Sequence, residues 1–460
     1  MIRVSMTAVC AACALLLVGG LSSTKGLGAP APSPSPSATP AVPLPPLLTL
    51  ADAENIALAR SPVLVAARAA ISQAEAGVNL AASGGQPNVS LAATSTRSKS
   101  SLRNQGGSGN SANGGFSGSS VLFTSNNAAL NLRQLVLDGG RIRAQVNSAR
   151  YTTDAARLSL RRQFDVVAFN VAQAYYTALE SRHQLGTARD SLHLAQVQAN
   201  LVQAQFRAGL AARADVLTAQ LPVAQARLAI AQAQNGERTQ EAALLNAMGL
   251  PSQTAVALAD DTSVSAHGPS LQDVLAFALA QRPDLLAAQA SALAAGENVR
   301  AARLLRFPLV SATASNGLAS TTSSGGGFGN NFSVGLGLSL PLLDGGAIKA
   351  QTAIAQAQAD TSQATLQSTV LEVSLNVQQG YLALQTAQAG TAAADAELAQ
   401  ARTVLAVTNA QYRAGVTTLP LLLNAQVGFA KAESDQVNAL YAYKVAQQQL
   451  LFVEGVIGSK

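Results

Sequence analysis

Residues 332–346 read FSVGLGLSLPLLDGG, and this stretch decides the fold. In its first part every second position is apolar, namely Phe332, Val334, Leu336, Leu338, Leu340 and Leu342. The positions between them hold serine, glycine and proline. Strands of about ten residues that are apolar on one face and small or polar on the other are typical of transmembrane β-barrels. The Asp-Gly-Gly that follows favours a sharp turn into a helix, because Asp is a good N-cap and Gly permits the bend.

The Asp-Gly-Gly motif occurs twice, at 138–140 and at 344–346, and the sequence around it corresponds as well. The matching segments are Leu50–Pro62 (LADAENIALARSP) with Leu271–Pro283 (LQDVLAFALAQRP), Tyr175 with Tyr381, and Phe206–Gly209 (FRAG) with Tyr412–Gly415 (YRAG). So many landmarks in the same order indicate an internal duplication. Its period is far longer than that of a solenoid repeat, so each copy is a whole substructure.

Each copy predicts the same order of elements: helices interrupted by a proline, two strands, a very long helix that stops at a glycine, and a return helix. We expect repeat one at 48–250, with helices over 50–85, strands at 87–97 and 126–137, a long helix over 139–208 and a return helix over 214–249. We expect repeat two at 271–455, with helices over 271–306, strands at 308–317 and 331–343, a long helix over 346–414 and a return helix over 418–454. Residues 251–270 connect the two repeats.

The long helices carry the apolar spacing of a coiled-coil seam. The seam residues are Leu160, Phe164, Val167, Val171, Ala174 and Ala178 in the first, and Val370, Val373, Val377, Tyr381 and Leu384 in the second. A helix of about 70 residues is roughly 105 Å long. The shorter helices of each repeat, stacked end to end, nearly match that length, so each repeat predicts two antiparallel helical columns.

The N-terminus carries the features of a secretory signal peptide. Arg3 precedes an apolar run from Ala8 to Val18, and small residues follow it. We expect a signal peptide over 1–29, cleaved between 20 and 31, and a Pro/Ser-rich linker over 30–47. Cys10 and Cys13 lie in the part that is removed, so the mature chain is expected to have no disulfide and no thiolate metal site.

The amino-acid composition excludes some classes of fold and function. Charged residues make up 12% of the chain, against ~25% in a typical soluble domain. Aromatic residues are only 4%, so the sequence favours helices packed closely over long distances rather than a thick core. The net charge is +6, without the basic patch and interleaved aromatics of a nucleic-acid-binding surface, so nucleic acid is not an expected partner.

Four strands cannot close a barrel, and open sheet edges are not tolerated in lipid. The chain is therefore expected to oligomerise, and three copies would supply a plausible pore of 12 strands. A soluble sheet with one buried face shows the same alternation. The secretion signal and the long loops at 98–120 and 318–331 favour the membrane interpretation. Arginines cluster just after the first Asp-Gly-Gly, and either they form a solvated or ion-paired helix face or Arg141 and Arg143 reach lipid headgroups beneath the barrel.

Taken together, the duplicated opening helices, the twin Asp-Gly-Gly joints and the F/Y-R-A-G turns resemble the TolC-like outer-membrane efflux protein family over residues 48–455. The resemblance implies a mainly α fold: a long antiparallel coiled-coil helical barrel, plus a small transmembrane β-barrel with four strands per protomer, 12-stranded in a trimer. It implies a passive exit duct in the outer membrane of a Gram-negative-type envelope, with a long periplasmic extension. The implied partners of this homotrimer are a periplasmic adaptor (membrane fusion protein) and an inner-membrane pump of RND, ABC or MFS type, in tripartite efflux or type I secretion.

The resemblance also assigns roles to residues. Asp138, Gly139, Gly140, Asp344, Gly345 and Gly346 form the barrel–tunnel joints, and the adaptor-docking tips are Ala208, Gly209, Leu210, Ala414, Gly415 and Val416. Relatives carry a ring of aspartates after the second tip, but this chain has Leu421 and Asn424 there, and Thr417 replaces the basic partner. The expected periplasmic constriction is therefore apolar, formed by Leu419, Leu421 and Leu422 with Asn424 nearby, and Asp215 is the nearest remaining carboxylate.

Catalysis is not expected. The sequence has no G-x-S-x-G, H-E-x-x-H or P-loop motif, and His183, His193 and His267 have no metal-ligand spacing, so no enzyme activity, metal or cofactor is predicted. The alternative function is a secreted periplasmic coiled-coil scaffold or adaptor without a pore. A simple scaffold needs neither the four alternating strands nor the duplication, which favours the duct.

Overall fold

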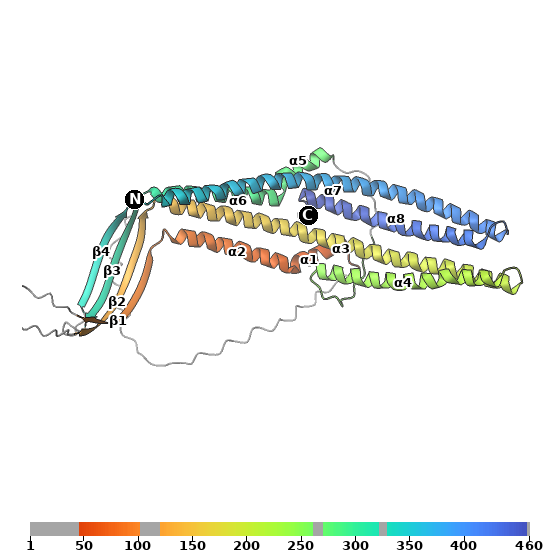
Figure 1. Ribbon diagram of the computed structural model, residues 1–460, viewed down its shortest axis with the longest axis horizontal. Coiled ribbons are helices and arrows are strands. Elements are labelled where there is room, and N and C mark those ends of the chain that lie inside the picture. The colour runs from red at the N-terminus through yellow and green to blue at the C-terminus, as the bar shows by residue number, and fades with distance from the viewer. Residues whose placement is uncertain (1–45, 102–119, 261–269, 322–328, 458–460) are drawn as a thin grey trace, which may run out of the picture. The chain divides into compact units, whose positions relative to one another are not determined.

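The computed structural model describes residues 46–101, 120–260, 270–321 and 329–457. The expected signal peptide and most of the expected linker lie outside these residues, as do Cys10, Cys13 and His267. The described elements, in chain order, are α1 (Leu50–Arg60), α2 (Pro62–Ser83), β1 (Asn88–Ser101), β2 (Ser120–Leu137), α3 (Arg141–Arg207), α4 (Arg213–Ala247), α5 (Leu271–Gln281), α6 (Pro283–Arg303), a 3₁₀ turn (Leu304–Arg306), β3 (Leu309–Thr321), β4 (Gly329–Ser339), α7 (Ala347–Arg413) and α8 (Leu419–Glu454), as drawn in Figure 1.

The long helices α3 and α7 are the main elements, each of 67 residues. They are rich in alanine and glutamine, which have high helix propensity. α2 and α4 both pack along α3, and α6 and α8 both pack along α7, so in each repeat the shorter helices follow one another beside the long one. α3 also contacts α6 and α8 of the second repeat.

The predicted seams lie in the cores between these helices. Val167, Val171 and Ala178 are buried in one apolar cluster, against which Leu160, Phe164 and Ala174 pack. In the second repeat Val373 and Val377 are buried, and Val370, Tyr381 and Leu384 pack against them. The seam prediction is confirmed in both repeats.

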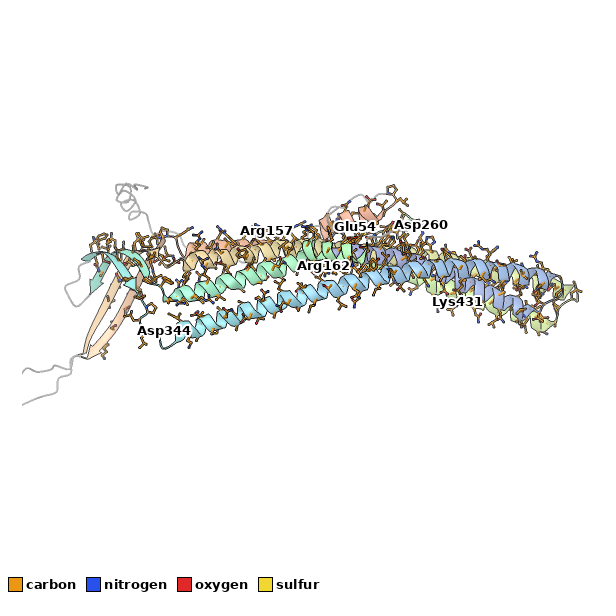
Figure 2. All side chains as sticks on the ribbon, turned by 90° about the horizontal axis from the view of Figure 1, so that it is seen from above. Glu54, Arg157, Arg162, Asp260, Asp344 and Lys431 are labelled. Atoms are coloured by element: carbon orange, nitrogen blue, oxygen red, sulfur yellow. The ribbon has the colours of Figure 1, made fainter. Side chains whose placement is uncertain are left out.

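Two arginines tie the end of α8 to the rest of the bundle. Arg162 of α3 donates to the carbonyl oxygen of Phe452 at 3.1 Å and stacks on its ring, with 3.9 Å between the guanidinium carbon and the ring centre. Arg282, almost fully buried before α6, forms a bidentate pair with Asp284 and also donates to the carbonyl of Val453. Burial lowers the pKa of Arg162, and the Asp284 carboxylate opposes this. Figure 2 shows Arg162 along the middle of the helices.

The segment between the repeats is fastened at the middle of α3. Leu48 and Leu258 form a parallel β-bridge, and the hydroxyl of Tyr175 lies 3.1 Å from the carbonyl oxygen of Leu48 and 2.5 Å from that of Ala259. Leu48, Leu258 and Tyr175 are all buried in the cluster that also holds the first seam. The start of repeat one and the described part of the connecting segment are therefore held at the same place, around Tyr175.

The strands form one antiparallel sheet in the order β1-β2-β3-β4, so β2 and β3 join the two repeats. All four strands differ from the ranges expected from sequence. β1 continues to Ser101, β2 starts at Ser120 and β3 continues to Thr321, because residues beyond the expected strand ends also pair across the sheet. β4 ends at Ser339 rather than at 343, since Pro341 lacks the N–H that a strand needs. Among the described residues, no helix is long and apolar enough to cross a membrane.

Candidate channel site: sheet faces, joints and tips

The register places the alternating residues of all four strands on common faces. One face is mainly apolar, and its paired rows include Val89 with Leu132, Leu91 with Leu130, and Ala314 with both Leu132 and Val334. Leu91 and Leu336 on this face are 76% and 78% exposed, so the described chain leaves it uncovered. A row of apolar side chains open on one side of a sheet fits contact with lipid.

The opposite face is polar or small. Ser90 pairs with Asn131, Asn131 with Ser315, and Ser315 with Ser333, so one polar row crosses the whole sheet. The hydroxyl oxygens of Ser315 and Ser333 lie 2.8 Å apart. Polar side chains on the face turned away from lipid are what a water-filled barrel interior requires.

At the first joint, Asp138 caps the start of α3 from a position before the helix. Its two carboxylate oxygens accept the backbone N–H groups of Gly140 at 2.9 Å and Ile142 at 2.5 Å. We expected Asp138 at the N-cap, but the structure places Gly140 there, since Gly139 and Gly140 have φ of 68° and 90° and cannot begin the helix. The two left-handed residues redirect the chain, while the carboxylate satisfies N–H groups that the helix leaves open.

The second joint repeats this geometry. Asp344 accepts the N–H groups of Gly346 at 3.0 Å and Ile348 at 2.7 Å, and Gly345 and Gly346 have φ of 64° and 88°. These hydrogen bonds favour the charged carboxylate and lower the pKa of Asp344, with the bond from Ile348 contributing most. In Figure 2, Asp344 lies where the sheet meets the helices, and Lys431 lies in their other half.

The two tips close with the same helix-ending motif. Gly209 and Gly415 have φ of 74° and 72°. At the first tip, Leu210 N–H donates to the carbonyl of Gln205 and Gly209 N–H to that of Phe206; Val416 and Gly415 repeat this pattern at the second. This is a Schellman ending, which requires the left-handed residue that Gly supplies. Leu210 and Val416 beside these glycines are 81% and 76% exposed.

The structure divides the residues expected to form the constriction. Leu419 and Leu422 are 4% and 0% exposed, and Leu419 packs against Val202 and Val216 of the first repeat. Leu419 therefore helps to hold the two hairpins together, and neither leucine is exposed in the described chain; the constriction itself stays a prediction. Leu421, 51% exposed, and Asn424 lie on the open face of α8.

A polar contact joins the tips of the two repeats. The hydroxyl of Tyr412 donates to the side-chain oxygen of Gln205 at 3.0 Å. Burial raises the pKa of Tyr412, and the negative charge of nearby Asp215 adds to this rise, so the hydroxyl stays protonated and able to donate. Asp215 itself accepts the N–H of Ala212 at 3.1 Å, as expected of a carboxylate in the first turn of α4. Our sequence analysis missed the Tyr412–Gln205 contact, although Tyr412 in place of Phe206 in the repeated motif was the available signal.

No group of three or more His, Asp or Glu side chains in the described part of the chain is arranged to hold a metal ion. Of the described histidines, His183 bonds to Asp260, with 2.9 Å between its Nε2 and a carboxylate oxygen.

The sheet, joints and tips can now be compared with known proteins. A profile of the family described as outer membrane efflux protein matches residues 54–250 and 274–456. The chain belongs to this family. It is 27% identical over 331 residues to the outer membrane efflux protein BepC of Brucella suis biovar 1, covering 69% of this chain and 71% of BepC. Protein CyaE of Bordetella pertussis is 29% identical over 449 residues, which are 95% of this chain and 91% of CyaE.

A solved structure of the outer-membrane channel OprN matches the fold with a TM-score of 0.76 at 21% identity, covering 88% of this chain and 89% of OprN. The family and the fold are those of channel proteins, which confirms the TolC-like resemblance and the mainly α fold class. This outer membrane efflux protein therefore acts as an outer-membrane channel with a periplasmic helical extension.

Proposed function

We propose that three copies of the chain close one 12-stranded barrel and one helical tunnel, which together form a passive exit duct. The observation that carries this proposal is the four-stranded sheet, in which the outer edges of β1 and β4 pair with no strand of the described chain. Edges of this kind leave backbone N–H and C=O groups unpaired, which lipid does not tolerate. Pairing β4 of one copy with β1 of the next satisfies both edges and continues the apolar and polar faces around the barrel.

We further propose that the tips receive a periplasmic adaptor and that an inner-membrane pump of RND, ABC or MFS type supplies the energy. Exposed Leu210 and Val416 at the tips support this, since an apolar side chain on a rigid turn is a suitable anchor for a partner. In this proposal the duct itself is passive.

Cysteine cross-linking tests the closure. Thr94→Cys lies in β1 and Ser333→Cys in β4, both on the polar face of the sheet, and the mature chain is expected to contain no other cysteine. In outer-membrane fractions, a bismaleimide should convert the double variant into covalent trimers, and each single variant should stay monomeric on denaturing gels. The control pair, Leu130→Cys with Asn316→Cys, faces across β2 and β3 of one chain and should give only intrachain links. A double variant that stays monomeric, in a protein that also runs as a monomer in mild detergent, would refute the trimer.

A further inference from the structure

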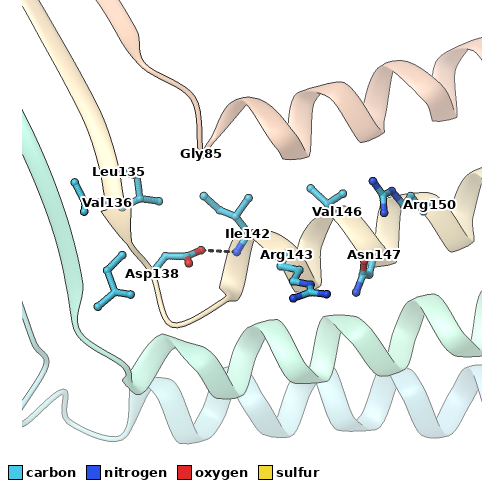
Figure 3. A pocket seen from close by; sticks show the side chains of 10 residues that line it. Gly85, Leu135, Val136, Asp138, Ile142, Arg143, Val146, Asn147 and Arg150 are labelled. Atoms are coloured by element: carbon cyan, nitrogen blue, oxygen red, sulfur yellow. Dashed lines mark hydrogen bonds between the residues drawn. The ribbon is translucent and has the colours of Figure 1, made fainter. Parts of the chain in front are cut away.

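A groove of about 500 Å³ lies at the first joint, between the end of β2 and the start of α3 (Figure 3). Its strand side is apolar, formed by residues 135–137 with Ile142, and Val136 and Leu137 are 60% and 52% exposed. Its helix side carries Arg143, Asn147 and Arg150. The wall of the groove thus changes from apolar to basic in the direction from the sheet to the helices.

The second joint has a corresponding groove of about 600 Å³. Lys349 takes the place of Arg143 relative to the joint aspartate, and Arg303 and Arg306 at the end of α6 add two more cations. Just beyond the end of β4, Leu342 and Leu343 are 88% and 95% exposed. The duplication has therefore kept the same polarity, apolar beside basic, while changing most of the residues that produce it.

Both grooves have a net positive charge. Within the described residues, Arg143, Arg150, Arg306 and Lys349 form no ion pair, and Arg303 bonds only to the neutral side chain of Gln356. Asp138 lines the first groove and Asp344 the second. Each of these carboxylates already accepts hydrogen bonds from two backbone N–H groups. Each groove thus offers two or three cationic side chains that form no ion pair with its carboxylate.

The position of the grooves identifies their ligand. The strands lie in the outer membrane and the helices extend into the periplasm, so the strand ends mark the periplasmic face of the bilayer. At that level acyl chains give way to phosphate groups, and apolar side chains followed by Arg and Lys match this order. We propose that each groove binds one anionic phospholipid of the periplasmic leaflet, with the phosphate on the basic side chains and the acyl chains against residues 136–137 or 342–343. The inference goes beyond the duct and requires only that the strands lie in the membrane.

Native mass spectrometry of the full-length protein in mild detergent tests the proposal, with dioleoylphosphatidylglycerol as the probe. The wild type should retain two lipids per chain. Arg143→Gln with Arg150→Gln should retain one, as should Arg303→Gln with Lys349→Gln, and the fourfold variant none. Each lost site should bind about tenfold more weakly, because that factor corresponds to one charge-assisted hydrogen bond.

The control variant removes the same charge elsewhere. Arg227 and Arg238 are exposed on α4, which contributes no residue to either groove, so Arg227→Gln with Arg238→Gln should keep two lipids. Two retained lipids in the fourfold variant, or an equal loss in the control, would overturn the proposal. Displacement by glycerol phosphate at equal concentration would also overturn it and assign the grooves to free phosphate esters. Lipids are counted per chain, so the result does not depend on the trimer.

Discussion

Gly139 and Gly345 have nearly the same backbone conformation, with φ of 68° and 64°, but only Gly139 is enclosed. A Cβ on Gly139 would lie 2.6 Å from the Cβ of Phe307, whereas a Cβ on Gly345 meets nothing within 4 Å. Alanine at either site costs roughly 1–2 kcal/mol for the left-handed backbone, and overpacking at Gly139 adds about 1–3 kcal/mol. We expect Gly139→Ala to lower the melting temperature more than Gly345→Ala does. Equal shifts would mean that Phe307 moves aside without cost.

The carboxyl of Asp344 gives the second joint a pH dependence. Its pKa is lowered in the folded protein, so it stabilises the folded state above its unfolded pKa of about 3.9, and this contribution is lost as the pH falls through the folded pKa. Asp344→Asn should therefore lower the melting temperature at neutral pH, and the difference from wild type should shrink below about pH 4. Thermal unfolding followed by circular dichroism from pH 2 to pH 7 measures it. A difference that persists unchanged at pH 2 would contradict this account.

The tip of α8 shows how two leucines about half a turn apart can serve different purposes. Leu421 is exposed, and Leu419 is buried against the first repeat. We expect Leu421→Ser to raise single-pore conductance in planar bilayers, because it makes an apolar constriction easier to wet. Leu419→Ser should instead destabilise the packing of the hairpins, by the roughly 2–5 kcal/mol typical of truncating a buried leucine. Asp215→Asn should change conductance little. A pore opened by Asp215→Asn and not by Leu421→Ser would show that charge holds it closed.

These elements also show what the sequence could predict. Local patterns were enough for the strands, the long helices and their seams, since alternation and heptad spacing depend only on neighbouring residues. The orientation of the α8 tip depends on the other hairpin, so the sequence could not separate Leu419 from Leu421. The sequence placed Asp138 at the N-cap of α3, whereas it lies two residues before the N-cap. Its carboxylate can accept backbone N–H groups of the first turn from either position, so the sequence could not distinguish them. The extra length of β1 comes from polar residues, and these pair with an added part of β2 that includes Val121, Leu122 and Phe123.

At the scale of the whole molecule, the duplicated halves are joined but not equivalent. β2 and β3 pair across the repeats, and α3 contacts α6 and α8, so the two halves share one sheet and pack against each other. Matching landmarks in the sequence predicted the duplication. They could not show which of the two repeats holds the segment that connects them. The matched tyrosines reveal this difference: Tyr175 bonds to the carbonyls of Leu48 and Ala259, whereas in the described part of the chain the Tyr381 hydroxyl bonds to neither segment.

This difference predicts unequal effects of two equivalent substitutions. Tyr175→Phe removes the hydroxyl that contacts the carbonyls of Leu48 and Ala259. The Leu48 carbonyl still accepts the N–H of Ala259, so the lost hydrogen bond falls on the carbonyl of Ala259 and costs about 1–3 kcal/mol; it should loosen both the start of repeat one and the connection. Tyr381→Phe removes a hydroxyl that holds no such segment and should cost little. We therefore expect only Tyr175→Phe to speed hydrogen exchange at the backbone N–H groups of Leu48 and Ala259, which bond to each other's segment. Equal exchange in the two variants would show that the paired backbone, and not Tyr175, fastens the two repeats together.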